Sequence, residues 1–145
     1  PISSQTLTKS ISKSLKINLR KAEELKIKEG LLGKKEIFEA MVPSLTDLVE
    51  QIETHLKYYH SHASKSQILH DGKRLEKILL CGGGANLKGL INFLSSSLKI
   101  KVELANPWTN ILKGKVKELP ELPFEKSLGY TTALGLALRG AKENS

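Results

Sequence analysis

The sequence contains little cysteine and no long apolar run. Its single cysteine, Cys81, cannot form a disulfide within the chain, and its apolar neighbours predict a small buried side chain. No stretch approaches the roughly 18 consecutive apolar residues that a membrane-spanning helix requires. No secretory signal segment is visible, so we expect a cytoplasmic location without direct insertion into a membrane. The first residue is Pro1 rather than methionine, which indicates a fragment or a trimmed chain.

Aromatic residues make up only 5% of the chain, although its formal charge is +8. Residues 1–35 hold nine Lys and Arg residues against three Glu residues, so most of the excess lies there. A basic segment can attract nucleic acid, acidic lipid or phosphate. Nucleic-acid-binding modules usually interleave aromatic residues with basic ones, and the first aromatic residue here is Phe38. We therefore favour a solvated, lysine-rich helix surface without a specific nucleic-acid partner; a basic nucleic-acid-binding helical module is the alternative.

The usual sequence motifs of catalysis are missing. Neither a GxxxxGK[ST] phosphate loop nor a GxSxG nucleophile motif occurs, and Leu87 stands where a dinucleotide-binding fingerprint requires a small residue. No carboxylate pair lies near the glycines, so no general base is close to them in sequence. No cysteine or carboxylate completes a convergent metal site with His55, His60, His62 or His70. The sequence therefore predicts no catalytic residues and no metal site.

The first part of the chain is predicted to be helical. Residues 4–15 place apolar side chains four apart, which is typical of a short amphipathic helix capped by Ser3 or Ser4. Asn18 is the predicted N-cap of a second helix, and Gly30 is its predicted end.

A third helical pattern runs from Lys34 to His62, with apolar residues at three- and four-residue steps. Such a seam is typical of a core or a helix–helix interface. Pro43 lies inside it and predicts a kink or a new helix start, because proline lacks the N–H that a helix interior uses. A polar loop is predicted over residues 61–73.

The second part reads as β-α-β-α. Residues 78–81 form a short apolar strand, glycines follow, and a helix is predicted from about Asn86. Residues 101–104 are a second strand, an irregular stretch containing Trp108, Val116 and Pro120 comes next, and residues 126–140 are a last helix. We place a mostly helical region at residues 1–74 and the β-α-β-α region at residues 75–145. The fold class is α/β, and so small a sheet indicates that further strands come from elsewhere, either an earlier segment or another chain.

The glycine turn organises the second part. A strand followed by Gly82, Gly83 and Gly84 and then by a helix directs unpaired backbone N–H groups at one spot, where an anion can bind. A tight strand–helix connection that binds nothing remains the alternative. The residues of the turn do not decide between the two.

The longer segment EKILLCGGGANLKGLINFLSSSLKIKVELANPWTNI resembles the adenosine-binding region of actin-like ATPases, in the version carried by the PilM family of type IV pilus assembly proteins. TLTKSISKSLKINLRKAEELKIKEG, VPSLTDLVEQIETHLKYYHSH and SLGYTTALGLALRG resemble further stretches of that family in the same order. The FtsA and MreB families share the fold but resemble these stretches less closely. The resemblance implies the helical subdomain 2B followed by the later β-α-β-α part of subdomain 2A.

The resemblance also implies which residues meet a nucleotide. The adenosine motif corresponds to five consecutive residues, whose backbone approaches the ribose and α-phosphate: Gly82, Gly83, Gly84, Ala85 and Asn86. Glu23 and Lys26 correspond to the helix that borders adenine and ribose, although an ordinary surface ion pair is the alternative for these two.

The implied function is the nucleotide-binding half of a cytoplasmic scaffold for type IV pilus assembly. ATP with Mg²⁺ would act as a conformational switch, and a weak ATPase activity is the most that is expected. The implied partner is a PilN-like inner-membrane pilus protein, bound through a first domain that this chain lacks, so that the scaffold is peripheral to the inner membrane; self-association is left open. The alternatives are an FtsA/MreB-like filament or cell-division protein and a phosphotransferase of the same superfold.

Overall fold

The computed structural model describes residues 3–63, 75–109, 111 and 122–143. By their contacts, residues 1–78 and 87–102 form one compact unit, and residues 79–86 and 103–145 form a second. The predicted features at His70, Val116 and Pro120 lie outside the described residues. The predicted division between residues 74 and 75 stays a prediction.

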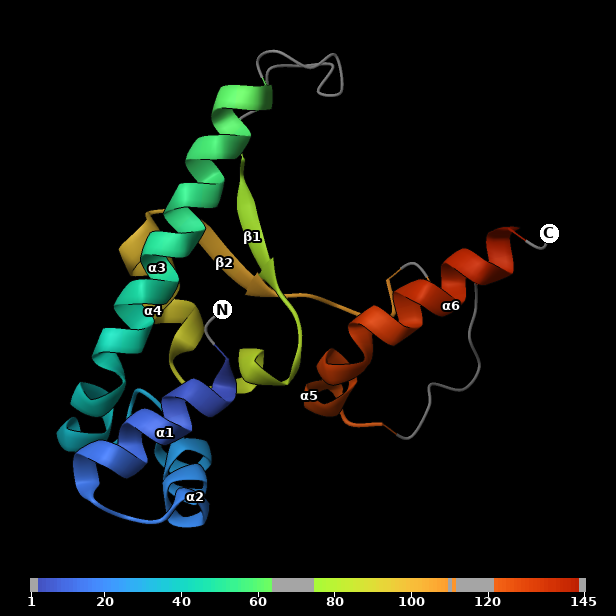
Figure 1. Cartoon of the computed structure of the whole chain (residues 1–145). Coiled ribbons are helices and arrows are strands. Elements are labelled where there is room, and N and C mark those ends of the chain that lie inside the picture. Colours follow the sequence, from blue (N-terminus) through green and yellow to red (C-terminus); the bar gives the residue numbers. More distant parts are fainter. Residues whose placement is uncertain (1–2, 64–74, 110, 112–121, 144–145) are drawn as a thin grey trace. The chain divides into compact units, whose positions relative to one another are not determined.

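Helices α1 (Ser4–Leu15) and α2 (Leu19–Glu29) begin at the predicted caps (Figure 1). The Ser3 side chain accepts a hydrogen bond from the Thr6 N–H, and the Thr6 hydroxyl accepts one from the Ser3 N–H, which satisfies two backbone donors at the start of α1. The Asn18 side chain accepts from the Lys21 N–H at 2.8 Å. Gly30 ends α2 with a φ of 60°, a conformation that favours glycine.

Helix α3 (Lys35–Ala63) is a single helix that contains Pro43. The prediction of a long helix is confirmed, with each end one residue from its predicted place. Of the two alternatives predicted at Pro43, the new helix start is wrong, and the kink stays a prediction. Proline cannot donate to the Glu39 carbonyl, but the apolar face on both sides of it stays packed, and this packing outweighs the loss of one hydrogen bond.

The core of the first unit lies where α1, α2 and α3 pack together. Its buried apolar side chains recur on one face of each helix, as the sequence pattern predicts. They are Leu7, Ile11, Ala22, Ile37, Ala40, Met41 and Leu45.

The small sheet contains two strands, β1 (Lys77–Leu80) and β2 (Lys101–Leu104), whose arrows point the same way in Figure 1. Helix α4 (Leu90–Leu98) connects them and buries Leu90, Leu94 and Leu98. Its Phe93 ring packs edge-on against Phe38 of α3, with the ring centroids 6.5 Å apart. The mixed helix-and-strand class is confirmed by this arrangement.

Strand β1 has apolar residues on both faces, yet Leu79 is 54% exposed. The prediction that Cys81 is buried is wrong, because its side chain is exposed. Leu79 and Cys81 lie two residues apart and therefore point to the same face of the strand. Among the described residues, nothing buries either side chain.

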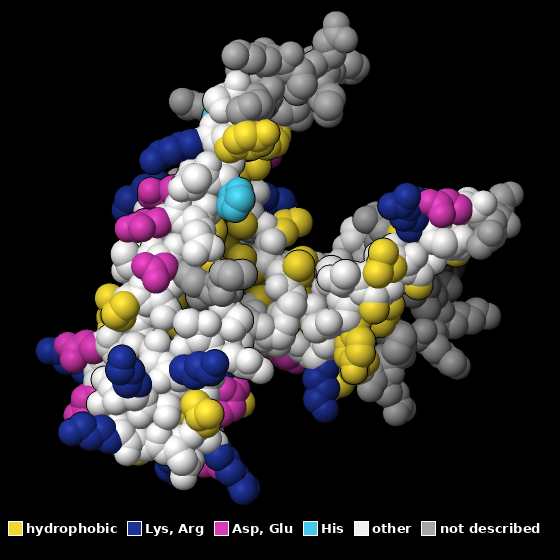
Figure 2. Space-filling view, in the orientation of Figure 1, with side chains coloured by type: hydrophobic (Ala, Val, Ile, Leu, Met, Phe, Trp, Pro, Cys, Tyr) yellow, Lys and Arg dark blue, Asp and Glu magenta, His cyan; other side chains and the backbone are white. Residues whose placement is uncertain are grey.

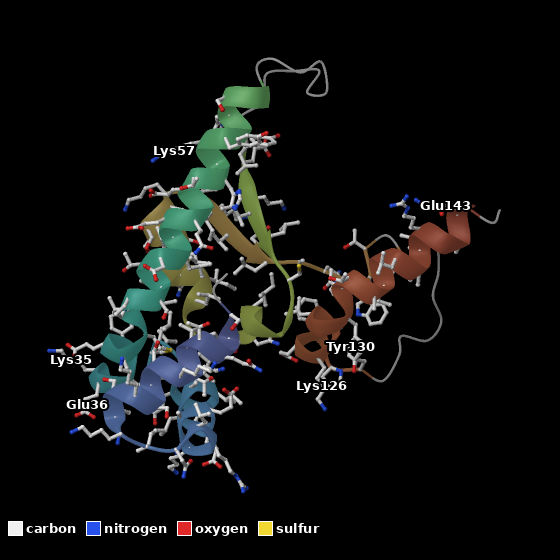
Figure 3. All side chains as sticks on the ribbon, in the orientation of Figure 1. Lys35, Glu36, Lys57, Lys126, Tyr130 and Glu143 are labelled. Atoms are coloured by element: carbon white, nitrogen blue, oxygen red, sulfur yellow. The ribbon has the colours of Figure 1, made fainter. Side chains whose placement is uncertain are left out.

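The C-terminal segment is not the single helix predicted over residues 126–140. It consists of α5 (Phe124–Ser127), a 3₁₀ turn η2 (Leu128–Tyr130) and α6 (Thr131–Glu143). Ser127 and Leu128 are fully buried and anchor the short elements, whereas no residue of α6 is buried. The labelled side chains of Lys126 and Tyr130 project outward from this segment (Figure 3).

Candidate functional site

The glycine turn follows β1 directly. Gly82 has a φ of 88°, which favours glycine, and a 3₁₀ turn η1 (Gly83–Asn86) comes next. The Gly82 N–H donates to the Leu128 carbonyl at 2.9 Å, and the Ala85 N–H donates to the Gly82 carbonyl at 3.1 Å. These bonds and the burial of Ala85 fix the path of the turn within the second unit.

Asn86, the last residue of η1, links the turn to α5 by a hydrogen bond. Its side-chain amide Nδ2 donates to the Glu125 carbonyl at 2.7 Å, in the short helix α5. The side chain of Asn86 therefore has a structural role, so only its backbone is offered to a nucleotide. The sequence did not indicate this bond, because Glu125 lies far along the chain.

Gly82 and Gly83 leave open space beside the turn. A Cβ built on Gly82 or Gly83 would meet no atom within 4 Å. Neither the Gly83 N–H nor the Gly84 N–H has a hydrogen-bond partner among the described residues. Two neighbouring backbone donors without a partner, in a turn with open space beside it, can receive a phosphate or hydroxyl oxygen.

The helix after the glycines begins later than predicted. Helix α4 starts at Leu90 with Gly89 as its N-cap, whereas the sequence predicted a start near Asn86. Gly89 has a φ of 84° and makes no side-chain capping bond. The donors at the glycine turn are therefore those of the turn itself, and the N-terminus of α4 does not contribute to them.

Glu23 and Lys26 form a polar cluster between α1 and α2. The ammonium Nζ of Lys26 donates to Glu23 Oε2 at 2.8 Å, to Thr8 Oγ1 at 2.9 Å and to Ser4 Oγ at 2.6 Å. It also lies 3.0 Å from the Ser4 carbonyl oxygen. These four acceptors take up all three protons of the ammonium group. The Lys26 side chain is only 5% exposed.

Glu23 keeps one oxygen available. Its Oε2 accepts from Lys26 and from the Thr8 hydroxyl, whereas its Oε1 has no partner among the described residues. The side chain is 44% exposed, so Oε1 can accept a hydrogen bond from a ligand. The surface-ion-pair interpretation is therefore inadequate for Lys26, which is buried, but is compatible with Glu23.

An open pocket of about 520 Å³ lies over this cluster. Three of the residues that line it are cationic, namely Lys9, Arg20 and Lys26. The full lining comes from α1 and α2 and consists of Ser4, Gln5, Thr8, Lys9, Leu19, Arg20, Glu23 and Lys26. Ser4 and Thr8 were missed by the sequence analysis. Their i,i+4 spacing places them on one face of α1, but only the packing of the helices shows which residues that face meets.

The two groups of predicted site residues belong to different units. Glu23 and Lys26 contact each other in the first unit, and the five residues of the glycine turn are consecutive in the second. Each group is thus a defined local structure. The assignment of both groups to one nucleotide stays a prediction.

The pKa of the Glu23 carboxyl is lowered from its ordinary value of 4.5. Burial by itself raises this pKa, but hydrogen bonds from Lys26 and Thr8, together with the positive charge of Lys26, outweigh it. The folded state therefore favours the charged carboxylate. This effect stabilises the folded state above about pH 4.5 and is lost as the pH falls through the lowered pKa.

Replacement of Glu23 by Gln should lower the thermal unfolding temperature near neutral pH. The difference from the unaltered chain should narrow as the pH falls from about 4.5 through the lowered pKa, below which the carboxyl is protonated in both states. Thermal unfolding followed by circular dichroism between pH 3 and 7, in ~0.1 M salt, measures both curves. Glu24→Gln is the matched control, because Glu24 only pairs with Arg20 and Lys21 at 3.6 Å on the exposed face. A pH-independent difference for Glu23→Gln would contradict the assignment.

The basic surface of the first unit is interspersed with carboxylates (Figure 2). Arg20 and Lys21 pair with Glu24, and Lys35 pairs with Glu39 at 3.5 Å. The arrangement fits the solvated helix surface that we favoured. In the described ranges, no three His, Cys, Asp or Glu side chains converge on a possible metal position, and no helix is long and apolar enough to cross a membrane.

Comparison with known proteins places the chain in a class of pilus-assembly components. A solved structure described as a PilM–PilN type IV pilus biogenesis complex matches with a TM-score of 0.72 and 29% identity. The match covers 96% of this chain but only 37% of the other, so the chain spans well under half of that relative. A comparison with curated proteins gave no significant match.

Residues 3–141 match the family described as type IV pilus assembly protein PilM. Because this match covers nearly the whole sequence, the chain belongs to the PilM family. The resemblance noted from the sequence is confirmed. Neither a filament protein of the FtsA/MreB kind nor a phosphotransferase is favoured by these matches.

Proposed function

We propose that this chain supplies part of the nucleotide site of a PilM-family scaffold with the actin-like fold. Residues 1–74 would correspond to subdomain 2B, and the β-α-β-α region at residues 75–145 to the later part of subdomain 2A. The observation that carries the proposal is the pair of N–H groups of Gly83 and Gly84, which have no hydrogen-bond partner among the described residues and belong to a turn with open space beside Gly82 and Gly83.

The residues present suit the ribose and phosphate groups of ATP. The turn offers two backbone donors for phosphate or ribose oxygens. Glu23 Oε1 is a free acceptor for ribose hydroxyls, and Lys26 holds the other oxygen of that carboxylate in place. Mg²⁺ would be held mainly by the ATP phosphates, because the described residues contain no cluster of carboxylates that could bind it alone.

ATP would act as a switch rather than as the substrate of an efficient enzyme. None of the five residues of the glycine turn has a side chain that could act as a general base, and we propose no catalytic residue in this chain. A nucleotide that binds two parts of a protein favours their closed arrangement by its differential affinity. At most, a weak ATPase activity is expected.

The proposed partner is a PilN-like inner-membrane protein. The support for it is the similarity to a chain of a PilM–PilN complex. We place its docking surface in the first domain of the family fold rather than on these residues, and we place the scaffold in the cytoplasm beside the inner membrane. Self-association is not part of the proposal.

Titration of the ¹⁵N-labelled chain with ATP·Mg²⁺ tests the nucleotide site. Because the two groups of residues supply only part of a binding site, we expect weak binding, with a dissociation constant of about 1 mM or above. The amide resonances of Gly82 to Asn86 should shift most, with smaller shifts near Glu23. Arg139 and its neighbours in α6 are an internal control and should not respond.

Two outcomes would contradict the proposal. Shifts that omit the glycine turn would show that ATP binds elsewhere. Low-micromolar binding, about −8 kcal/mol, would show that the chain already contains a complete site.

A further inference from the structure

The Thr8 hydroxyl belongs to the polar cluster between α1 and α2. Its side chain is buried on α1, which packs against α2 (Figure 1). The hydroxyl Oγ1 lies within hydrogen-bonding distance of three groups: the Lys26 ammonium at 2.9 Å, the Ser4 carbonyl at 3.1 Å and the Glu23 carboxylate. A hydroxyl group carries one proton, so the carbonyl and the carboxylate compete for it.

The proton of Thr8 goes to Glu23 rather than to Ser4. An ammonium group has no acceptor, so Lys26 donates to Oγ1 and cannot receive its proton. Of the two remaining groups, the Glu23 carboxylate is charged, and hydrogen bonds to charged acceptors are stronger than those between neutral groups. The pKa of the Glu23 carboxyl agrees with this assignment, because burial raises it but hydrogen bonds from Lys26 and Thr8 and the Lys26 charge lower it overall.

Two donors from different helices therefore meet at one oxygen of Glu23. Lys26 reaches Oε2 from the next turn of α2 at 2.8 Å, and Thr8 reaches the same oxygen from α1. A carboxylate oxygen offers about two acceptor positions, so these donors fill those of Oε2. Lys26 alone could pair with either oxygen, because the last torsion of a glutamate side chain is loosely restrained. Thr8 thus determines which oxygen stays free.

The free oxygen, Oε1, belongs to a residue that lines the open pocket of about 520 Å³. The other charged residues of the lining are the cations Lys9, Arg20 and Lys26, so Glu23 is its single carboxylate among the described residues. A carboxylate oxygen accepts hydrogen bonds and repels phosphate. Within a nucleotide it therefore suits the hydroxyl groups of the sugar.

We infer that Thr8 is a positioning residue, which holds Oε2 of Glu23 so that Oε1 accepts a sugar hydroxyl and disfavours a sugar without hydroxyls. Thr8 acts through Glu23 rather than on the ligand. The inference rests on the proposed function, because it names the residue that gives the nucleotide site its preference for ribose. All the bonds that carry it join residues of the first unit.

Titration of the Glu23 carboxyl, followed by its ¹³Cδ resonance, tests the positioning bond without nucleotide. Thr8→Val replaces the hydroxyl by a methyl group, so the pKa of Glu23 should rise toward its ordinary value. Thr8→Ser keeps a hydroxyl and should restore the lowered pKa. The other charged groups of the pocket, Lys9, Arg20 and Lys26, are the same in all three proteins. An unchanged pKa in Thr8→Val would overturn the inference.

The sugar preference is measured by titrating the ¹⁵N-labelled chain with ATP·Mg²⁺ and with 2′,3′-dideoxy-ATP·Mg²⁺. In the unaltered chain, the Glu23 amide should respond about 10-fold more strongly to ATP, because a hydrogen bond to a charged group is lost with the hydroxyls. In Thr8→Val the two responses should come within about 2-fold of each other, and Thr8→Ser should restore the preference. A purely structural role of Thr8 would weaken both responses equally and keep the preference, which would contradict the inference.

Thr54→Val is the matched control. Thr54 Oγ1 donates to the Glu50 carbonyl, four residues earlier on α3, at 2.8 Å. The substitution thus removes a local bond of the kind that joins Thr8 to Ser4, and it should change neither the pKa of Glu23 nor the sugar preference. If Thr8→Val unfolds the first unit, Thr8→Ala takes its place with the same expected results, since it also lacks the hydroxyl and crowds no neighbour.

The nucleotide titrations separate this inference from the proposed function. If ATP shifts the glycine turn but Glu23 responds equally to both nucleotides, the proposed site is supported and the role of Thr8 is wrong. If Glu23 shows the preference for ribose and the glycine turn does not respond, the role of Thr8 is supported and the proposed site at the turn is wrong. The absence of any ATP response at either place would contradict both.

Discussion

Replacement of Leu45 by Ala should lower the free energy of unfolding of the first unit by about 3 kcal/mol. Leu45 is fully buried on α3, in the core shared with α1. The substitution removes three buried carbons and leaves a cavity, because the surrounding structure relaxes only partially. The loss of buried apolar surface and the cavity both lower the stability.

Urea unfolding of the two proteins, followed by circular dichroism, measures the difference. Leu32→Ala is the matched control, because Leu32 is 72% exposed and should change the stability by less than about 0.5 kcal/mol. If Leu45→Ala cost no more than this control, the packing of α3 against α1 would be wrong. The unfolding curve should be analysed for the first unit, since the chain contains two compact units.

Replacement of Lys26 by Ala should cost about 2–3 kcal/mol of stability, more than is usual for a lysine. The ammonium group is the donor to Glu23, Thr8 and Ser4, so its loss leaves their oxygens without their partner. The exposed part of Glu23 can turn to water, which moderates the cost. The lost packing contacts of the buried Lys26 methylene groups increase the stability cost.

Two further variants isolate the cause. Lys26→Met keeps most of the stem and loses the donors, so it should remain clearly destabilised if hydrogen bonding dominates. Lys21→Ala removes a lysine of the same helix that is 59% exposed, and it should cost less than about 0.5 kcal/mol. A Lys26→Ala protein as stable as Lys21→Ala would show that the cluster between α1 and α2 does not form.

The helices of the first unit could be predicted closely because local signals mark their ends. Ser3 and Asn18 cap α1 and α2 as predicted, and Gly30 ends α2. The seam of α3 needs only the spacing of its apolar residues. At Pro43 the sequence left a kink and a new helix start open, because a helix start and an internal proline look alike in sequence, and only tertiary packing excludes the new start.

The glycine turn was predictable as a local structure, but its geometry was not. A glycine triplet after a strand indicates a turn, but the pattern does not show that the turn becomes 3₁₀ or that α4 starts at Leu90. The bonds of Gly82 to Leu128 and of Asn86 to Glu125 join segments distant in sequence. Long-range contacts of this kind leave no periodic signal.

The burial of Lys26 also depends on long-range packing. Its spacing from Glu23 predicts a helix-face ion pair, which forms. The pattern of α2 alone does not reveal that Ser4 and Thr8 of α1 cover this pair. The burial predicted for Cys81 was wrong for a different reason. An apolar strand predicts that both of its faces are buried, and one face of β1 is exposed.

The central claim is that the glycine turn contacts ATP. Its most direct test is the amide titration with ATP·Mg²⁺, run in parallel on the unaltered chain, on Gly83→Val and on Gly135→Val. A Cβ at Gly83 would meet no atom within 4 Å, so the turn should fold while the branched side chain of valine occupies the space beside Gly83. Gly135 has equally open surroundings and places the same side chain on α6.

We predict that ATP shifts the resonances of residues 82–86 in the unaltered chain and in Gly135→Val, and that Gly83→Val reduces this response by about 10-fold or more. Equal responses in all three proteins would contradict the claim that the nucleotide lies against the glycine turn.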